Sequence, residues 1–215
     1  TAVAVAVLSV YSMVVLAAPG AKASGELSVS GQVTVNGQKM ISGGTIFSDS
    51  TINTAAQSSA SVIISKVGRV ELAPNTNLRL SFAANSITAL LETGSAQVST
   101  FAGTTVNLTT KDGTVVVDGS EATSFTVSAL KGRTSMATLS GIAQFKAGGA
   151  TKQVAAGESA TAGMPQTDDD DDDLSGGALA VLLLAIGGAV AGVLYAAFHN
   201  NDLNFGGDVT VVSPT

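Results

Sequence analysis

Apolar and small polar side chains alternate with a period of two along most of residues 24–163. Residues 77–82, 105–109 and 124–128 each place Leu, Val or Phe at every second position, with Ser, Thr, Asn or Arg between them. Successive side chains of a strand point to opposite faces of its sheet, whereas a helix repeats every 3.6 residues. The pattern therefore predicts an all-β domain of half-buried strands, each about five or six residues long.

Turn-forming residue pairs separate the alternating segments. Four of these pairs carry glycine at their second position, and they are Asn36-Gly37, Asp112-Gly113, Lys131-Gly132 and Gly148-Gly149. Pairs of this kind favour tight hairpin turns, because glycine adopts positive φ angles without steric cost. The sequence therefore predicts several short hairpins.

A short unit also recurs, in which glycine is followed by apolar residues at the second and fourth positions after it. Its copies begin at Gly31, Gly94 and Gly141. The two apolar residues of each copy point to one face of a strand. Together with the turn pairs, the unit predicts an elongated stack of short hairpins around one core, sandwich-like or solenoid-like.

Weak motifs follow one another in a family-specific order from residue 42 to residue 163. They are Gly43-Gly44-Thr45-Ile46, Thr51, Ile63-Ile64, Val70-Glu71-Leu72-Ala73-Pro74-Asn75-Thr76, Leu91-Glu92-Thr93-Gly94-Ser95-Ala96-Gln97-Val98, residues 109–117, residues 119–127, and Val154-Ala155-Ala156-Gly157-Glu158. In this order and spacing the chain resembles the FecR-like periplasmic domain. It departs from the family pattern at Lys66-Val67-Gly68-Arg69, where an Asp-Gly-Ser turn is usual, and at Gly119-Ser120, where Gly-Thr is usual.

The resemblance implies an elongated all-β domain outside the cytoplasm. In the best-known members, this domain relays a signal from an outer-membrane receptor to a sigma factor through a cytoplasmic anti-sigma segment. Residues 1–215 show no segment of that kind, so sigma-factor signalling is an alternative rather than the main hypothesis. A self-assembling structural protein of the envelope is the other alternative. The main hypothesis is a membrane-tethered envelope protein that presents the domain as a non-catalytic binding or sensing module.

The N-terminal residues 1–23 are predicted to be a truncated signal peptide. Residues 2–16 form an apolar run of a length typical of a signal peptide, and Pro19 and Gly20 end it. Small residues at Ala21 and Ala23 suit a cleavage before Ser24. The alternatives are an uncleaved anchor and a buried core helix.

Residues 174–198 are 25 residues without a charged side chain, which predicts a transmembrane helix. Such a helix would be about 37 Å long and would cross a hydrocarbon core of about 30 Å with some tilt. Gly188 and Gly192 form a Gly-xxx-Gly pair that allows close helix packing, so a homo-oligomer through the membrane helix is one hypothesis. Glycine is also common in such helices without any packing role.

Residues 164–173 are predicted to be an acidic linker, because they contain six consecutive aspartates at 168–173. Like charges repel and extend the chain. Calcium binding is the alternative, although the run lacks the glycine and the closing glutamate of a calcium loop. A short tail at residues 199–215 would follow the helix on the cytoplasmic side.

Charge and composition exclude several classes of function. Residues 24–163 carry nine Lys or Arg and eight Asp or Glu, and residues 164–215 carry eight Asp and no Lys or Arg. The chain thus has no basic surface for nucleic acid, so no nucleic-acid partner is expected. It has no cysteine, and its single histidine, His199, is interpreted as a solvated side chain.

No catalytic, cofactor-binding or metal-binding residues are predicted. Carboxylates that could be paired for catalysis occur near strand ends and turns, where a solvated acid is the ordinary interpretation; they are Glu71, Glu92, Asp112, Asp118, Glu121 and Glu158. The partners expected are the membrane and an envelope protein that contacts a strand edge or the Ser/Thr-rich face of residues 42–163. The location expected is the periplasmic side of the bacterial inner membrane, with a single membrane pass.

Overall fold

The computed structural model describes residues 23–163 and 183–186, and these residues confirm the predicted all-β domain. They form 17 strands that hydrogen bonding connects into one continuous sheet, folded into two layers. Layer A contains, in spatial order, β4 (Gly44–Phe47), β1 (Ser24–Ser30), β6 (Ser59–Ile64), β7 (Gly68–Leu72), the second half of β9 (Ser86–Thr100), β12 (Ser124–Leu130), β13 (Arg133–Ser140), β16 (Glu158–Gly163) and β17 (Leu183–Ile186).

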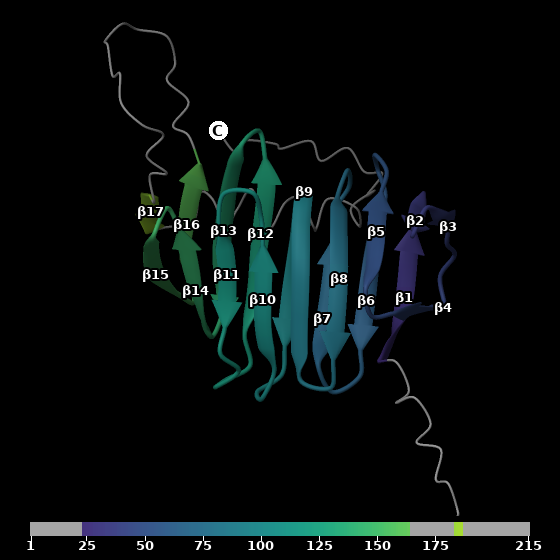
Figure 1. Cartoon of the computed structure of the whole chain (residues 1–215), viewed down its shortest axis with the longest axis horizontal. Coiled ribbons are helices and arrows are strands. Elements are labelled where there is room, and N and C mark those ends of the chain that lie inside the picture. The colour runs from purple at the N-terminus through teal and green to yellow at the C-terminus, as the bar shows by residue number, and fades with distance from the viewer. Residues whose placement is uncertain (1–22, 164–182, 187–215) are drawn as a thin grey trace, which may run out of the picture.

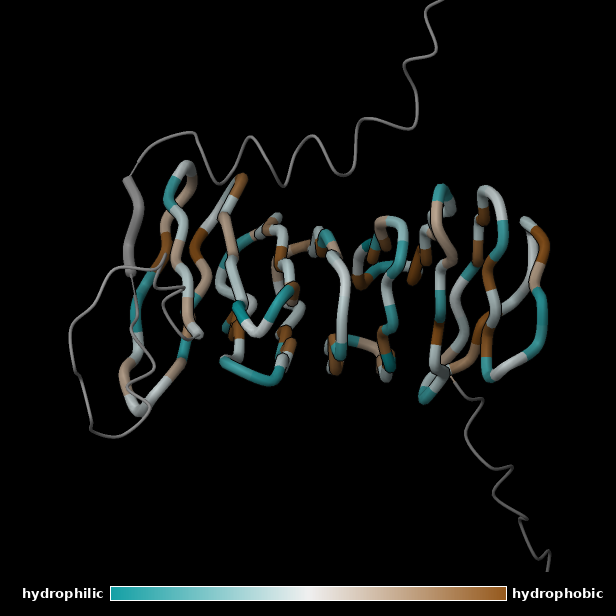
Figure 2. Tube along the Cα trace, turned by 90° about the horizontal axis from the view of Figure 1, so that it is seen from above, coloured by the Kyte–Doolittle hydropathy of each residue, from teal (hydrophilic) through white to brown (hydrophobic). Residues whose placement is uncertain are grey.

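Layer B lies opposite layer A and has the same number of strands. In spatial order it contains β3 (Gln38–Lys39), β2 (Val33–Val35), β5 (Ser50–Thr54), β8 (Asn77–Ala83), the first half of β9, β10 (Thr105–Thr109), β11 (Thr114–Val117), β14 (Ile142–Ala147) and β15 (Ala150–Ala155). The strands follow one another along the long axis of the molecule (Figure 1), and the two layers appear as two rows in the view from above (Figure 2). The domain is therefore an elongated two-layer sandwich.

Strand β9 belongs to both layers. Residues from Ser86 to Thr93 pair with β8 and, in part, with β10, whereas residues from Gly94 to Thr100 pair with β7 and β12. The pairing of β9 with β10 is parallel, and every other strand pairing among the described residues is antiparallel. This strand lies at the middle of the stack and joins its two halves.

The core lies between the layers and is built from the apolar positions of the alternating pattern. Along β8 buried residues alternate strictly with exposed or half-buried ones, and Leu78, Leu80 and Phe82 face the core. Along β10 and β12 the core residues include Leu108, Phe125 and others of the predicted set. The period-two pattern thus correctly predicts which apolar side chains face the core, although Thr126 and Ser128 on the other face of β12 are buried as well.

Three of the four predicted turn pairs form two-residue hairpin turns. Asn36-Gly37 joins β2 to β3, Lys131-Gly132 joins β12 to β13, and Gly148-Gly149 joins β14 to β15, each with positive φ at both residues. Positive φ at both central residues defines the turn whose twist matches that of a hairpin. The fourth pair, Asp112-Gly113, closes a longer turn between β10 and β11.

The recurring glycine unit has a different role from the one predicted. Gly31 lies between β1 and β2, Gly94 lies within β9, and Gly141 lies between β13 and β14. At all three the chain passes from one layer to the other, and all three glycines have φ between 74° and 94°. The unit marks crossings between the layers rather than hairpins within one layer, because a sharp change of direction needs a residue without a Cβ.

The structure differs from the sequence analysis at residues 183–186, where a helix is predicted. These residues form β17, which pairs antiparallel with β16 from Glu158 to Thr161. A short apolar run does not distinguish helix from strand by periodicity, and β16 offers a free edge that β17 completes. Within residues 23–163 and 183–186, no helix has the length and apolar character needed to cross a membrane. The rest of residues 174–198 lies outside the described residues, so the membrane anchor stays a prediction there.

Candidate functional site

The predicted working surface, the Ser/Thr-rich face and turns of residues 42–163, lies within the described part of the chain. Other predicted features do not. The described residues do not include residues 1–22 of the predicted signal peptide 1–23, the acidic linker 164–173, Gly188 and Gly192, or the tail 199–215 with His199. The roles of these segments stay predictions. Hollows on the outer surface of the sandwich are therefore the starting point for a site.

One hollow lies on the outer face of layer A, near the end of β9, and has a volume of about 570 Å³. We name it the Phe101 groove after the aromatic side chain in its lining. Its lining comes from β6, β7, β9 and the adjoining turns: Ile63, Ile64, Ser65, Lys66, Gly68, Arg69, Glu71, Gln97, Ser99, Thr100 and Phe101. Strand register brings these lining residues together, because Ile63, Arg69 and Ser99 are direct cross-strand neighbours in one row.

The Phe101 groove combines apolar and charged groups. Phe101 is 60% exposed and Ile63 is 37% exposed, so both present apolar surface to solvent. Beside them the Arg69 guanidinium contacts the Glu71 carboxylate, with 3.3 Å between Nη1 and Oε1. Lys66 adds a further cation at the turn between β6 and β7. Apolar anchors next to polar and charged groups are typical of a protein-binding surface.

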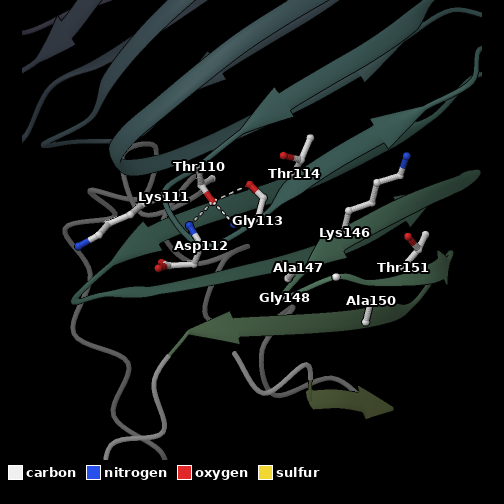
Figure 3. Close-up of a pocket in the computed structure, with 11 residues that line it drawn as sticks. Thr110, Lys111, Asp112, Gly113, Thr114, Lys146, Ala147, Gly148, Ala150 and Thr151 are labelled. Carbon is white, nitrogen blue, oxygen red and sulfur yellow. Dashed lines mark hydrogen bonds between the residues drawn. The ribbon is translucent and has the colours of Figure 1, made fainter. Parts of the chain in front are cut away.

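A second hollow, of about 450 Å³, lies between the β10–β11 turn and the β14–β15 hairpin. Figure 3 shows that Lys111 and Lys146 lie on opposite sides of this cleft and that their ammonium groups point away from each other. The two cations therefore do not converge on one anion site. Most of the other residues that line this cleft have small side chains, and they include Thr114, Thr151 and the Gly148-Gly149 pair.

The hydroxyl of Thr110 organises one wall of this cleft. Its Oγ1 accepts hydrogen bonds from the backbone N–H groups of Asp112, at 3.3 Å, and Gly113, at 3.1 Å (Figure 3). The same oxygen lies 2.7 Å from Oγ1 of Thr134, whose hydroxyl donates to the Asp112 carboxylate at 3.3 Å. These groups satisfy one another within the turn, so their role is to hold its shape.

A third hollow, of about 200 Å³, lies on the outer face of layer B beside Asp118. The Oδ1 atom of Asp118 accepts hydrogen bonds from the backbone N–H of Ser120, at 2.9 Å, and from its hydroxyl, at 2.7 Å. These bonds favour the ionised carboxylate and lower the pKa of Asp118 below its ordinary value of 3.8, the backbone bond having the largest effect. A lowered pKa suits a turn-forming carboxylate rather than a proton donor.

Two further acidic residues considered in the sequence analysis, Glu92 and Glu158, have separate structural partners. Glu92 accepts a hydrogen bond from the Asn77 amide at 2.8 Å, and Glu158 accepts one from the backbone N–H of Ala155 at 3.0 Å. Within the described residues, no group of three His, Cys, Asp or Glu side chains is placed to hold a metal ion. The Phe101 groove is therefore the best candidate for a functional site.

The sequence analysis does not single out Phe101, because one exposed aromatic in a loop leaves no periodic signal. One signal did point to this place: the departure from the FecR pattern at residues 66–69. The structure places Lys66, Gly68 and Arg69 in the groove lining, so this departure changes the chemistry of the candidate site.

Two crystal structures, each described as that of a "putative anti-sigma factor" from Parabacteroides distasonis, are similar to this chain. One has a TM-score of 0.50 and 15% sequence identity, and the match covers 64% of this chain and 59% of that chain. The other has a TM-score of 0.52 and 15% identity, and the match covers 67% of this chain and 63% of that chain. No protein-family model matches the chain, and no curated protein matches its sequence.

These similarities show the fold. They agree with the elongated all-β domain that the FecR resemblance implies. The chain spans about three fifths of the length of each Parabacteroides protein that it matches, so what the whole of those proteins does is not carried over with the fold.

Proposed function

We propose that residues 24–163 form the non-catalytic sensing domain of a regulator of the sigma-factor type, acting outside the cytoplasm. The observation that carries the proposal is the shared fold with the Parabacteroides proteins described as anti-sigma factors. In this role the domain binds a protein and changes the state of a signalling partner, which requires a docking surface rather than catalytic groups.

The Phe101 groove is the proposed docking surface. Phe101 and Ile63 supply apolar contact area. The Arg69–Glu71 pair beside them supplies charged groups that orient the bound partner. Interfaces draw most of their free energy from a few aromatic and Arg anchors at their centre, with polar groups around them. The groove lies on strands of a rigid sheet, so a partner meets a preformed surface.

In-cell photocrosslinking of the full chain tests this assignment. A photoreactive amino acid replaces Phe101 in one variant and Phe47 in the matched control. Phe47 is an aromatic residue of similar exposure, 52%, on β4 outside the groove lining. We expect the Phe101 variant to capture an outer-membrane receptor, which lies on the same side of the inner membrane as the domain, and the Phe47 variant to capture none.

A second candidate is a binding module of the cell envelope without a signalling role. The groove itself supports it, because docking needs only a protein partner. Capture of envelope structural proteins alone at position 101 would favour this candidate over sigma-factor regulation. Equal capture at positions 101 and 47 would mean that the groove is not the docking surface.

A further inference from the structure

The hollow of about 200 Å³ on the outer face of layer B is built from β11, β14, β15 and the turn after β11. Strand register forms its floor, because Val116 pairs with Gln144 and Gln144 pairs with Gln153. We name it the Gln144 pocket after the middle residue of this row. The residues that line it are Val116, Asp118, Ser120, Ile142, Gln144 and Gln153.

Two side-chain amides in this pocket are free to bind a ligand. Gln144 and Gln153 are exposed, and neither side chain makes a hydrogen bond or an ion pair with another described residue. As direct cross-strand neighbours on one face, they have Cβ atoms about 4.5–5.5 Å apart. Each primary amide offers two N–H donors and a carbonyl acceptor. The pair can therefore both donate hydrogen bonds to a ligand and accept them from it.

The carboxylate of Asp118 adds a fixed acceptor at the rim of the pocket. Its Oδ1 atom accepts the two hydrogen bonds from Ser120, which hold the side chain in place. Its Oδ2 atom accepts no hydrogen bond from the described residues. One carboxylate oxygen in a defined position thus remains available to a donor on the ligand.

Apolar surface lies beside these polar groups. Ile142 is 41% exposed, and it is the outward residue next to Gln144 along β14. Val116 is half-buried in the floor. The volume is smaller than the roughly 300–1,000 Å³ of pockets that hold a drug-sized molecule. The pocket therefore suits one small ring that carries polar groups and has an apolar side.

The charges around the pocket exclude an anionic ligand. Asp118 is the one charged residue among the described residues that line it. Lys146, the next outward residue after Gln144 on β14, lines the cleft between the two turns instead. Lys152 precedes Gln153 on β15 and so points to the opposite face of the strand. With no cation in the lining, a phosphate or carboxylate has no partner here.

We propose that the Gln144 pocket binds one sugar ring of a neutral glycan. Every sugar hydroxyl both donates and accepts hydrogen bonds, which matches two amides and one free carboxylate oxygen. The C–H groups of a sugar ring form an apolar side that fits against Ile142. The cross-strand row continues from Val116 to Asn107 on β10, an exposed residue, so a longer glycan meets a further amide beside the pocket.

This site is separate from the proposed docking surface. The Gln144 pocket lies on the outer face of layer B, whereas the Phe101 groove lies on the outer face of layer A. The two layers and the core lie between them. A bound glycan therefore leaves the Phe101 groove free, and the glycan proposal does not depend on the sigma-factor proposal.

Saturation-transfer NMR of the full chain tests the proposal. The probes are the methyl glycosides of glucose, galactose, mannose and N-acetylglucosamine, with choline as a cationic probe. Each is used at about 10 mM, where a site with a Kd of about 1 mM is largely occupied. We expect saturation transfer to at least one sugar and none to choline. Transfer to none of the sugars would overturn the proposal, and transfer to choline alone would mean that the pocket selects a cation through Asp118.

Two amide variants locate the bound sugar. Gln144→Leu and Gln153→Leu keep the side-chain length and remove the hydrogen-bonding groups at exposed positions, so the fold is retained. We expect each to raise the Kd of the sugar at least about fivefold. The matched control is Gln38→Leu, which removes an exposed amide from β3 at the other end of layer B and should leave the Kd unchanged. An unchanged Kd in both pocket variants would overturn the assignment, because the sugar would then bind elsewhere.

Discussion

Two glycines with similar backbone angles have very different surroundings. Gly94, with φ of 94°, lies where β9 crosses between the layers, and Gly132, with φ of 70°, lies in the hairpin turn between β12 and β13. A Cβ atom added at Gly94 would lie 2.5 Å from the Cα atom of Thr76, whereas one added at Gly132 would meet nothing within 4 Å. The crossing is packed against a neighbouring segment, and the hairpin turn is open.

The crossing at Gly94 is also held by buried hydroxyl groups. Oγ1 of Thr76 accepts a hydrogen bond from the backbone N–H of Ser95 at 3.0 Å and donates to its carbonyl at 3.2 Å. The backbone N–H of Thr76 in turn donates to Oγ1 of Thr54 at 2.9 Å. Three chain segments thus meet at one corner of the sandwich. This contrast shows that residues far apart in the sequence contact one another at the crossing between the layers, and not at the hairpin turn.

The largest effect is expected for Gly94→Ala. The positive φ costs about 1–2 kcal/mol for a residue with a Cβ, and the overlap with Thr76 adds about 1–3 kcal/mol. We expect the free energy of unfolding, measured by urea denaturation, to fall by roughly 3 kcal/mol. A loss no larger than that of Gly132→Ala would break the comparison, because the corner would then tolerate a methyl group.

A smaller effect is expected for Thr76→Val, which keeps the shape and removes the hydroxyl. The backbone N–H of Ser95 then loses a buried partner, which costs about 1–3 kcal/mol of unfolding free energy. Thr126→Val is the matched control, because the Thr126 hydroxyl is buried without a partner. We expect the control to be as stable as the unmodified chain or more stable. Equal losses in the two variants would mean that the corner hydrogen bonds contribute nothing.

Gly132→Ala should lower the free energy of unfolding by only about 1 kcal/mol, because backbone strain at positive φ is the one unfavourable effect of the added methyl group. Equilibrium unfolding in urea, run beside Gly94→Ala, measures the difference between an open and a packed positive-φ glycine. A loss above that of Gly94→Ala would reverse the comparison and show that the hairpin turn is the more constrained bend.

The smallest effect is expected for Asp118→Asn, at the crossing from β11 to β12. The pKa of Asp118 is lowered from 3.8 in the folded state by its hydrogen bonds with Ser120, so the ionised carboxylate stabilises the fold. That contribution is fully present above pH 3.8 and is lost as the pH falls through the lowered folded value. Denaturation midpoints of the two proteins should therefore differ at neutral pH and converge in strong acid. A difference that grows on acidification would contradict the assigned direction of the pKa shift.

The candidate site was less predictable than the fold. Ile63 and Arg69 lie in one hairpin, but Ser99 and Phe101 come about 30 residues later in the sequence. Only the register of β7 with β9 brings Ser99 into one row with the first two. The altered turn at residues 66–69 was the one local signal of the Phe101 groove. The burial of Thr126 and Ala137 at outward positions carried no signal, because Thr and Ala are equally compatible with exposed and with buried positions.

The sequence by itself determined that residues 24–163 form strands and which apolar side chains of each strand face the core, because alternation is a local property of the extended backbone. Only the tertiary structure decided which strands are neighbours, that Thr76 fills the corner at Gly94, and that β17 completes the edge of β16. These outcomes depend on contacts between residues far apart in the chain. A period of two specifies the face that is buried, but it does not specify the partner that buries it.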